Sequence, residues 1–199
     1  MFTGIVEELG RIRQVESRGE LLVVWVEAAG IADGLSVGDS IAVNGCCVTA
    51  TKLASHGFEC ELTPETLRRT AFEGRLVVDA PVNVERPMPA NGRFDGHIVQ
   101  GHVDGVGRVT AVARLGESAE IAFEPPADLL RYLVEKGSVA IDGISLTVAT
   151  LVENSFTVAV IPYTLEQTTL GAAGVGDLVN IEVDVVAKYV ERLLGERKR

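Results

Sequence analysis

The sequence of 199 residues is poor in cysteine and contains no long apolar segment. It has three cysteines, of which Cys46 and Cys47 are adjacent. They are too few for a disulfide framework and lack the C-x-x-C spacing of a zinc site. No apolar run approaches the ~20 residues that a membrane-spanning helix requires. The opening MFTGIVEELG lacks the basic region and apolar core of a signal peptide. We therefore expect a cytoplasmic protein with no membrane partner.

Basic residues are also scarce. Lys and Arg total 18 against 28 Asp and Glu, which gives a net charge of −10 at pH 7. A chain without a basic face cannot release counterions from a polyanion, so nucleic acid is excluded as a partner and a phosphate-rich ligand is disfavoured. No Walker motif is present, and Gly105-Val106-Gly107 lacks the third glycine and the following helix of a dinucleotide site. The sequence predicts neither a metal nor an organic cofactor.

The sequence does contain an internal duplication, in which residues 98 to 186 repeat the pattern of residues 1 to 87. Four segments recur in order at an offset of 97 or 98 residues: GIVEELGRI as GHVDGVGRV, SIAVNGCCVT as SVAIDGISLT, TPETLRRT as IPYTLEQT, and VNVE as VNIE. This offset exceeds the ~20–50 residues of a solenoid repeat and indicates a duplicated domain. We expect homologous domains at residues 1–87 and 98–186, a linker at residues 88–97, and a helix with a tail at residues 187–199.

Short runs rich in Val and Ile, separated by Gly, Asn and Asp, are typical of an all-β sandwich or barrel. These runs are Leu21–Val26, Ser40–Val43, Leu76–Val78, Val139–Ile141 and Phe156–Ile161. Asn44-Gly45 and Asp142-Gly143 stand at matching places in the two copies. Both dipeptides tolerate positive φ, so each predicts a tight hairpin turn.

Three internal segments have helical character. Pro64–Ala71 and Pro162–Leu170 resemble short helical turns with an early proline. Pro126–Lys136 predicts a longer helix, because four apolar residues share one stripe: Leu129, Leu130, Leu133 and Val134. Lys136 at the end of this helix would complement the helix dipole.

A further helix is expected near the C-terminus, outside the repeat. Its apolar residues recur at helical spacing: Val186, Val190, Leu193 and Leu194. Asp184 precedes them and is placed to cap the helix. The apolar stripe either docks on a β-domain or packs against copies of itself in an oligomer.

Two equivalent strands present small polar side chains. Strand alternation turns Ile144, Leu146 and Val148 toward the core and leaves Ser145 and Thr147 on the other face. The same alternation buries Cys46 and exposes Cys47 beside Thr49. These faces are either ordinary solvent faces or the walls of two similar pockets, and no general base stands beside Ser145 in the sequence.

The chain has three histidines, and His102 is the candidate for acid–base chemistry. His102 follows Gly101 at the start of the second repeat, and an imidazole titrates near neutrality, which suits proton transfer. His97 lies five residues earlier; on a strand this odd spacing would turn the two histidines to opposite faces and disfavour a two-histidine metal site. His56 lies in an expected hairpin tip and is predicted to be solvated.

Together, MFTGIVEELG, the NGCCVT and DGISLT pair, GHVDG, IPYTLEQTTLG and NIEVD closely resemble the riboflavin synthase family, which is built on a lumazine-binding repeat. The resemblance covers nearly the whole chain. It implies an all-β fold of two tandem six-stranded Greek-key β-barrels with short helices, and a C-terminal α-helix that assembles a homotrimer. It also implies a reaction without metal or organic cofactor. Two molecules of 6,7-dimethyl-8-ribityllumazine dismutate by transfer of four carbons, which gives riboflavin and 5-amino-6-ribitylaminouracil.

The resemblance further implies an active site between the N-terminal barrel of one subunit and the C-terminal barrel of another, holding two dimethylribityllumazines. His102 and Thr147 are expected to assist removal of a proton from the 7-methyl group of the substrate. Cys47 and Ser145 are expected to line the two pockets, while Ser40, Lys136, Asp142 and Asp184 match positions of the family's site. Lumazine synthase is a further candidate partner.

The implied catalytic residues are His102, Thr147, Cys47, Ser145, Asp184 and Ser40. The implied substrate-binding residues are Gly4, Ile5, Val6, Cys47, Val48, Thr49, Glu61, Leu62, Thr63, Pro64, Glu65, Thr66, Gly101, His102, Val103, Lys136, Ser145, Leu146, Thr147, Ile161, Pro162, Tyr163, Thr164, Leu165 and Glu166.

Lumazine-carrying luminescence proteins are the alternative, because they share the fold and the sequence resemblance but lack the reaction. Such a carrier would be expected to degrade one of its two pockets. Here both copies keep the hairpin, the polar pair and a P-x-T segment. The sequence therefore favours the enzyme.

Overall fold

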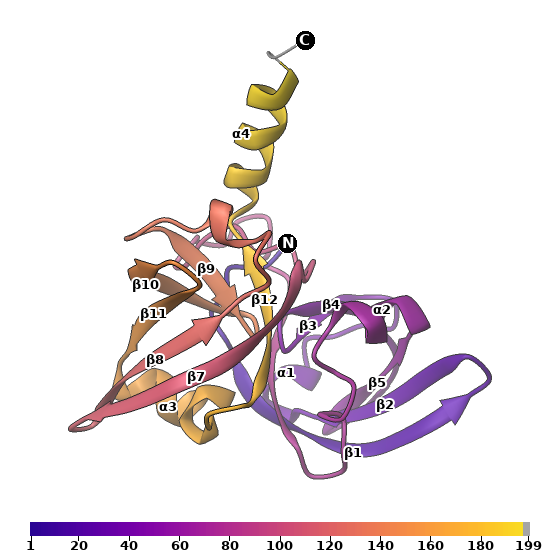
Figure 1. Ribbon diagram of the computed structural model, residues 1–199. Coiled ribbons are helices and arrows are strands. Elements are labelled where there is room, and N and C mark those ends of the chain that lie inside the picture. The colour runs from indigo at the N-terminus through magenta and orange to yellow at the C-terminus, as the bar shows by residue number, and fades with distance from the viewer. Residues whose placement is uncertain (197–199) are drawn as a thin grey trace.

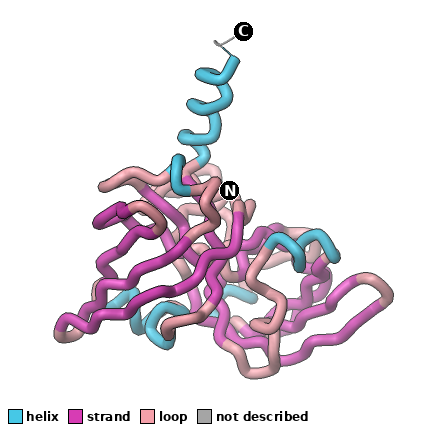
Figure 2. Tube along the Cα trace, viewed as in Figure 1, coloured by secondary structure: helices cyan, strands magenta, loops and turns pink. Residues whose placement is uncertain are grey.

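The computed structural model describes residues 1–196, which form two closed antiparallel β-barrels of six strands each (Figure 1, Figure 2). The first barrel consists of β1 (Glu8–Arg18), β2 (Leu21–Glu27), β3 (Ser40–Val43), β4 (Cys46–Ala54), β5 (Gly57–Leu62) and β6 (Pro81–Glu85). The second consists of β7 (Gly105–Leu115), β8 (Ser118–Glu124), β9 (Ser138–Ile141), β10 (Ile144–Val152), β11 (Ser155–Val160) and β12 (Leu178–Val183). The expected all-β fold of two six-stranded barrels is confirmed.

The duplication extends to the strand pairing. Neighbouring strands follow the order β1-β2-β5-β4-β3-β6 in the first barrel, and the second barrel has the equivalent order β7-β8-β11-β10-β9-β12. Register shifts also recur: the shift between Ile12 and Gln14 in β1 has its counterpart between Val109 and Ala111 in β7. A β-bulge bends a strand and increases its twist, so equivalent bulges close the two barrels in the same way.

Each barrel encloses its own apolar core. Ile12 and Phe58 are fully buried in the first barrel. In the second, the rings of Phe123 and Phe156 stack with their centroids 5.5 Å apart. Since each repeat buries its inward-facing residues separately, the outward faces of the strands remain available for a site.

The two predicted hairpin turns are confirmed, and they pack against each other. All four turn residues have positive φ: 43° at Asn44, 73° at Gly45, 46° at Asp142 and 80° at Gly143. A Cβ atom added to Gly45 would lie 2.5 Å from the amide nitrogen of Gly143. Glycine is therefore required by the close approach of the two turns as well as by the left-handed backbone.

The short helices that follow β5 and β11 are confirmed. The first is α2 (Pro64–Arg69), and the second is α3 (Pro162–Gln167), followed by the 3₁₀ helix η2 (Thr169–Ala172). Thr63 caps α2 through its side-chain oxygen, which accepts from the amide of Thr66 at 3.1 Å. A one-turn helix, α1 (Ala29–Ala32), was not expected from the sequence.

Two expectations about regular structure are wrong. In place of a helix over Pro126–Lys136 there is only the 3₁₀ helix η1 (Leu130–Tyr132). The amide of Lys136 donates to the carbonyl of Val148 at 2.9 Å, and Lys136 itself has a φ of 65°, so this residue ends no helix. Residues Leu76–Val78 form no strand: Leu76 anchors a loop in the core while Val77 and Val78 are exposed.

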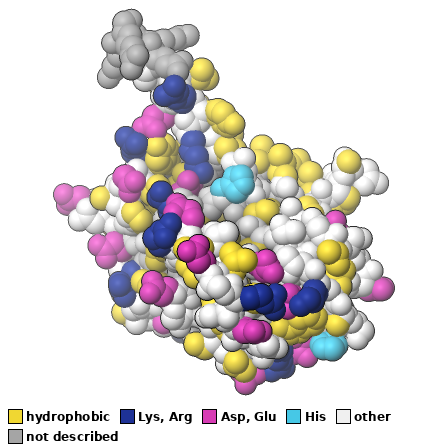
Figure 3. Space-filling view, turned by 90° about the vertical axis from the view of Figure 1, so that its right-hand side faces the viewer, with side chains coloured by type: hydrophobic (Ala, Val, Ile, Leu, Met, Phe, Trp, Pro, Cys, Tyr) yellow, Lys and Arg dark blue, Asp and Glu magenta, His cyan; other side chains and the backbone are white. Residues whose placement is uncertain are grey.

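The C-terminal helix α4 (Val185–Glu196) projects away from the second barrel (Figure 1). Asp184 caps it as predicted, because its Oδ1 accepts from the amide of Val186 at 2.9 Å. The apolar stripe is not docked on a barrel: Val190 is 49% exposed and Leu193 65% exposed. Figure 3 shows hydrophobic side chains along the projecting helix. No helix within residues 1–196 has the length and apolarity needed to cross a membrane.

Candidate active site

Each barrel carries a strip of small polar side chains beside its hairpin turn. The first polar strip is Ser40, Cys47 and Thr49, and the second polar strip is Ser138, Ser145 and Thr147. Strand pairing sets Ser40 opposite Thr49 and Ser138 opposite Thr147. Residues directly opposite each other on antiparallel strands share one face, so the hydroxyl groups of each strip lie together.

The predicted alternation of these strands is confirmed. Cys46 and Val48 are buried, Cys47 is half-buried and Thr49 is exposed. In β10, Ile144 and Val148 are buried, Ser145 is half-buried and Thr147 is exposed, while Leu146 packs on the core although it is only half-buried.

The environment of the cysteines singles out Cys47. Burial raises the pKa of Cys46 to about 12 and that of Cys60 to about 12, which keeps both as thiols near neutral pH. Both lie in the core of the first barrel. Cys47 is the one cysteine on the outer face of its barrel, where it is half-buried and packs against an apolar cluster of Phe2, Ala42, Val99 and Ala140.

The opening segment of each repeat packs beside the polar strip of the other repeat, so the two repeats exchange these segments. The amide of Ser145 donates to the carbonyl of Gly4 at 2.7 Å, and the amide of Cys47 donates to the carbonyl of Gly101 at 2.8 Å. The start of the first repeat therefore lies on the second barrel, and the start of the second repeat lies on the first. Val6 accordingly packs against the core of the second barrel and Val103 against that of the first. This exchange was not predicted from the sequence.

A buried carboxylate holds each exchanged segment in place. Glu85 on β6 accepts from the amide of Thr3 at 2.7 Å and from the amide of Gly4 at 3.1 Å. Glu182 on β12 accepts from the amides of Gln100 and Gly101 in the equivalent way. Burial raises the pKa of Glu85 to about 7 and also raises the pKa of Glu182. The hydrogen bonds oppose that shift because they favour the charged carboxylate.

His97 lies against the second polar strip, a position that the sequence did not predict. Its Nδ1 lies 2.7 Å from Oγ of Ser145, although no base stands beside Ser145 in the sequence. The spacing argument for the two histidines does not apply, because the chain between His97 and His102 is irregular apart from a single bridge at Val99. The sequence did contain a signal, since Gly96-His97 repeats as Gly101-His102.

His102 lies beside the first strip rather than the second. It follows Gly101, whose carbonyl bonds Cys47, and its own amide donates to Glu182 at 3.0 Å. The side chain is exposed. His102 and Cys47 therefore come together on the first barrel, whereas Thr147 lies on the second barrel of the same chain.

The helices α2 and α3 follow the strands that pair with the strip-bearing strands. Thr63 precedes α2 directly after β5, which pairs with β4. Ile161 precedes α3 directly after β11, which pairs with β10. Among the other predicted substrate-binding residues, Val48, Leu62 and Leu165 turn their side chains into the barrel cores, whereas Tyr163 and Glu166 are exposed.

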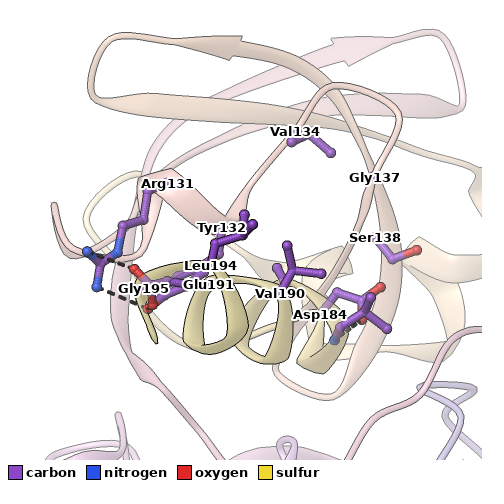
Figure 4. A pocket seen from close by; sticks show the side chains of 12 residues that line it. Arg131, Tyr132, Val134, Gly137, Ser138, Asp184, Val190, Glu191, Leu194 and Gly195 are labelled. Carbon is purple, nitrogen blue, oxygen red and sulfur yellow. Dashed lines mark hydrogen bonds and ion pairs between the residues drawn. The ribbon is translucent and has the colours of Figure 1, made fainter. Parts of the chain in front are cut away.

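Three further predicted positions lie away from the strips or already have a structural partner. Lys136 is exposed on the loop before β9. Asp142 is buried between the barrels, where its carboxylate accepts two bonds from Arg75, at 3.0 and 2.8 Å. Asp184 caps α4 and borders a hollow of about 630 Å³ between that helix and residues 131–138 (Figure 4). The hollow also contains Ser138 of the second strip.

Both strips open to solvent in the single chain. Thr49 and Thr147 are exposed, Ile161 is 61% exposed and Tyr163 is 70% exposed. Small-molecule sites normally bury most of the ligand surface. A small molecule bound on a strip this open would need a second surface to cover it.

Comparison with known proteins agrees with the duplicated architecture. The lumazine binding domain family matches residues 3–87 and again residues 100–184. A riboflavin synthase of Actinobacillus pleuropneumoniae is 46% identical over 194 residues, which cover 98% of this chain and 90% of that protein. The riboflavin synthase of Mycobacterium tuberculosis strain H37Rv is 45% identical, with 98% of each chain covered.

This chain belongs to the riboflavin synthase family. Solved structures with the same fold include LumP complexed with riboflavin, with a TM-score of 0.85 and 22% identity, covering 92% of this chain and 99% of that one. LumP complexed with 6,7-dimethyl-8-(1'-D-ribityl) lumazine has a TM-score of 0.83 and 21% identity, with the same coverage. At this identity the LumP structures establish the fold, while membership of the riboflavin synthases rests on the full-length sequence match.

Proposed function

We propose that this chain is a riboflavin synthase that dismutates two molecules of 6,7-dimethyl-8-ribityllumazine. One molecule transfers four carbons to the other, which yields riboflavin and 5-amino-6-ribitylaminouracil. The observation that carries the proposal is the pair of matched polar strips, each completed by a segment from the other repeat. Two similar binding surfaces suit a reaction between two identical substrates.

The proposed site lies between subunits of a homotrimer. Within one chain the two strips belong to different barrels, and both are open. The exposed apolar stripe of α4 supports assembly, because a helix with unburied Val190 and Leu193 gains stability by packing against copies of itself. Assembly would bring the first strip of one chain against the second strip of a neighbour. Holding two substrates in register can contribute ~7–11 kcal/mol toward the barrier in favourable cases.

Roles follow for the side chains on the strips. His102, exposed beside the first strip, is suited to accept a proton from the acidic 7-methyl group of a bound lumazine. Thr147, exposed on the second strip, would assist it from the neighbouring chain. Cys47 and Ser145 would line the two pockets and contact the ring. Asp184 and Ser40 are further candidates for a catalytic role. Asp184 already accepts a hydrogen bond as the cap of α4, and Ser40 lies in the first strip opposite Thr49. A cytoplasmic location and an association with lumazine synthase remain predictions.

Incubation with dimethylribityllumazine tests this function. Riboflavin should appear with its characteristic absorbance, in a ratio of one molecule for every two lumazines consumed. Lumazine that stays bound without turnover would instead select a carrier protein, the role for which the LumP complexes with lumazine and riboflavin provide the structural precedent. Failure to bind either ribityl heterocycle would exclude both functions.

A further inference from the structure

A lysine on α4 contacts the segment that carries His102. Nζ of Lys188 lies 2.7 Å from Oδ1 of Asp104, and the two side chains are only 28% and 20% exposed. Asp104 follows His102 by two positions, directly before β7. The roles proposed above use neither of these two charges.

Asp104 connects three parts of the second repeat. Its amide donates to the carbonyl of Ile181 at 2.9 Å, and its Oδ2 accepts from the amide of Val183 at 2.9 Å. Its other carboxylate oxygen faces Lys188. An ion pair whose carboxylate is held by further hydrogen bonds loses less side-chain entropy than a pair of mobile surface charges. Asp104 therefore joins the segment of residues 100–104 to the end of β12 and to α4.

The carboxylate of Glu182 belongs to the same cluster. It accepts from the three amides of residues 100–102, at 2.7, 2.9 and 3.0 Å. Burial raises the pKa of Glu182, whereas its amide hydrogen bonds and the charge of Lys188 oppose this shift. An ionised carboxylate is the stronger acceptor of amide hydrogen bonds. Lys188 thus supports both carboxylates that hold the segment in place.

The first repeat obtains the equivalent cation from within its own barrel. Glu7 corresponds to Asp104, and its Oε2 lies 2.5 Å from Nη2 of Arg86. Arg86 directly follows the repeated motif VNVE, but Val183 follows VNIE in the second repeat. The second repeat therefore has no arginine at this position, and α4 supplies the cation from outside the repeat.

We propose that Lys188 is a positioning residue that holds the segment of residues 100–104, and with it His102, at the first polar strip. The proposal rests on the proposed function, since His102 must face a substrate there. It makes the placement of His102 dependent on α4, so the helix serves the site of its own chain as well as the contact between chains. The opening segment of the first repeat, which has Arg86, does not depend on α4 in this way.

Hydrogen exchange tests the placement directly. Lys188→Met removes the charge and keeps most of the aliphatic side chain. The amides of residues 100–102 should exchange roughly three- to tenfold faster in this variant, as expected for loss of one charge-assisted contact. The amides of Thr3 and Gly4, which bond to Glu85, are the internal control and should exchange as in wild type. Lys188→Arg keeps the charge and should preserve the wild-type exchange at both places.

Kinetics connects the placement to the reaction. Lys188→Met should lower the turnover number roughly tenfold and change KM less than about twofold, because a displaced proton acceptor slows the chemical step more than it weakens binding. Light scattering on the same samples should show the wild-type oligomer. Lys52→Met is the matched control, because Lys52 also pairs with a glutamate, with Nζ 3.1 Å from Oε1 of Glu59. It should change neither the exchange nor the turnover number.

Asp104→Asn provides the same test without a change in α4. It removes the charge that faces Lys188 and keeps an oxygen that can accept from the amide of Val183. It should reproduce the losses of Lys188→Met with the oligomer intact. The double variant should lose no more than either single variant, because both act through one ion pair.

The outcomes are distinguishable. Unchanged exchange of residues 100–102 in Lys188→Met and Asp104→Asn would overturn the proposal and leave the proposed function in place. Equal acceleration at Thr3 and Gly4, an unchanged turnover number, or an arginine variant as defective as the methionine variant would likewise overturn it. A wild-type protein that forms no riboflavin would overturn the proposed function, and the positioning role of Lys188 with it.

Discussion

Gly4 and Ser145 are 141 positions apart in the sequence, yet the amide of Ser145 donates to the carbonyl of Gly4 at 2.7 Å. Gly4 has a φ of +77°, and a Cβ atom added to it would lie 2.7 Å from Cβ of Ser145. The position of Ser145 in the second polar strip therefore depends on a glycine near the N-terminus, where any side chain would clash with it.

Gly4→Ala should destabilise the protein by about 2–4 kcal/mol, because left-handed strain of about 1–3 kcal/mol is joined by a clash that displaces the exchanged segment. Gly19→Ala is the matched control, since Gly19 has a φ of +65° and no atom within 4 Å of the added Cβ. Denaturant titration of both variants measures the difference. Equal destabilisation would show that the contact with Ser145 is unimportant.

The stability of the fold should depend on pH through Glu85. Burial raises the pKa of Glu85 from 4.5 to about 7, so the folded state binds a proton more tightly than the unfolded state. This contribution is complete below pH 4.5 and is lost as the pH rises to about 7. Its upper bound is about 3 kcal/mol, because one pKa unit corresponds to about 1.4 kcal/mol.

Glu85→Gln removes this titration. The stability of the variant relative to wild type should therefore increase between pH 5 and pH 8, by up to the same ~3 kcal/mol, because only the wild type loses stability over this range. Urea denaturation at several pH values measures it. A difference that is constant with pH would show that Glu85 titrates normally in the folded protein.

His102 and Ile144 should separate catalysis from stability. His102→Ala should lower the turnover number roughly 100-fold or more, as expected for loss of an acid–base group, with little change in the unfolding midpoint. Ile144→Ala should instead cost about 2–5 kcal/mol of stability, because Ile144 is 4% exposed and its truncation leaves a cavity. Equal loss of folding in both variants would contradict the position of His102 at the site surface.

The assembly should depend on α4. A chain ending at Asp184, or the milder variant Leu193→Glu, should disperse the oligomer and lose activity at the same time, since the proposed site spans two chains. Light scattering and riboflavin formation, measured on the same samples, test this. Val175→Glu is the control, because Val175 is exposed in the loop before β12, and it should change neither the oligomeric state nor the activity. An active monomer would contradict a shared site.

Local sequence rules predicted the parts of the structure that local interactions determine. The hairpin turns follow from Asn44-Gly45 and Asp142-Gly143, and the polar strips follow from strand alternation. The helix expected over Pro126–Lys136 failed because Leu129 and Leu133 are buried within a loop whose end is bonded to β10. Tertiary contacts override a helical pattern of this length.

The exchanged segments and the contact of His97 with Ser145 depend on pairings across 48 to 141 residues. Periodicity carries no information about such distant partners. The repeated Gly-His dipeptides at Gly96 and Gly101 were the available signal, but the first of them lies in the segment expected to be only a linker.

The exchange of segments means that a repeat cannot form its own binding surface in isolation. An excised first repeat would keep Thr3–Val6 but lack the segment around Gly101, whose carbonyl accepts from the amide of Cys47. Two copies of that fragment could satisfy each other, each lending its opening residues to its twin. The present polypeptide has the geometry of such a reciprocal dimer within one covalent chain, and its two halves carry different side chains at equivalent places, Cys47 in one and Ser145 in the other.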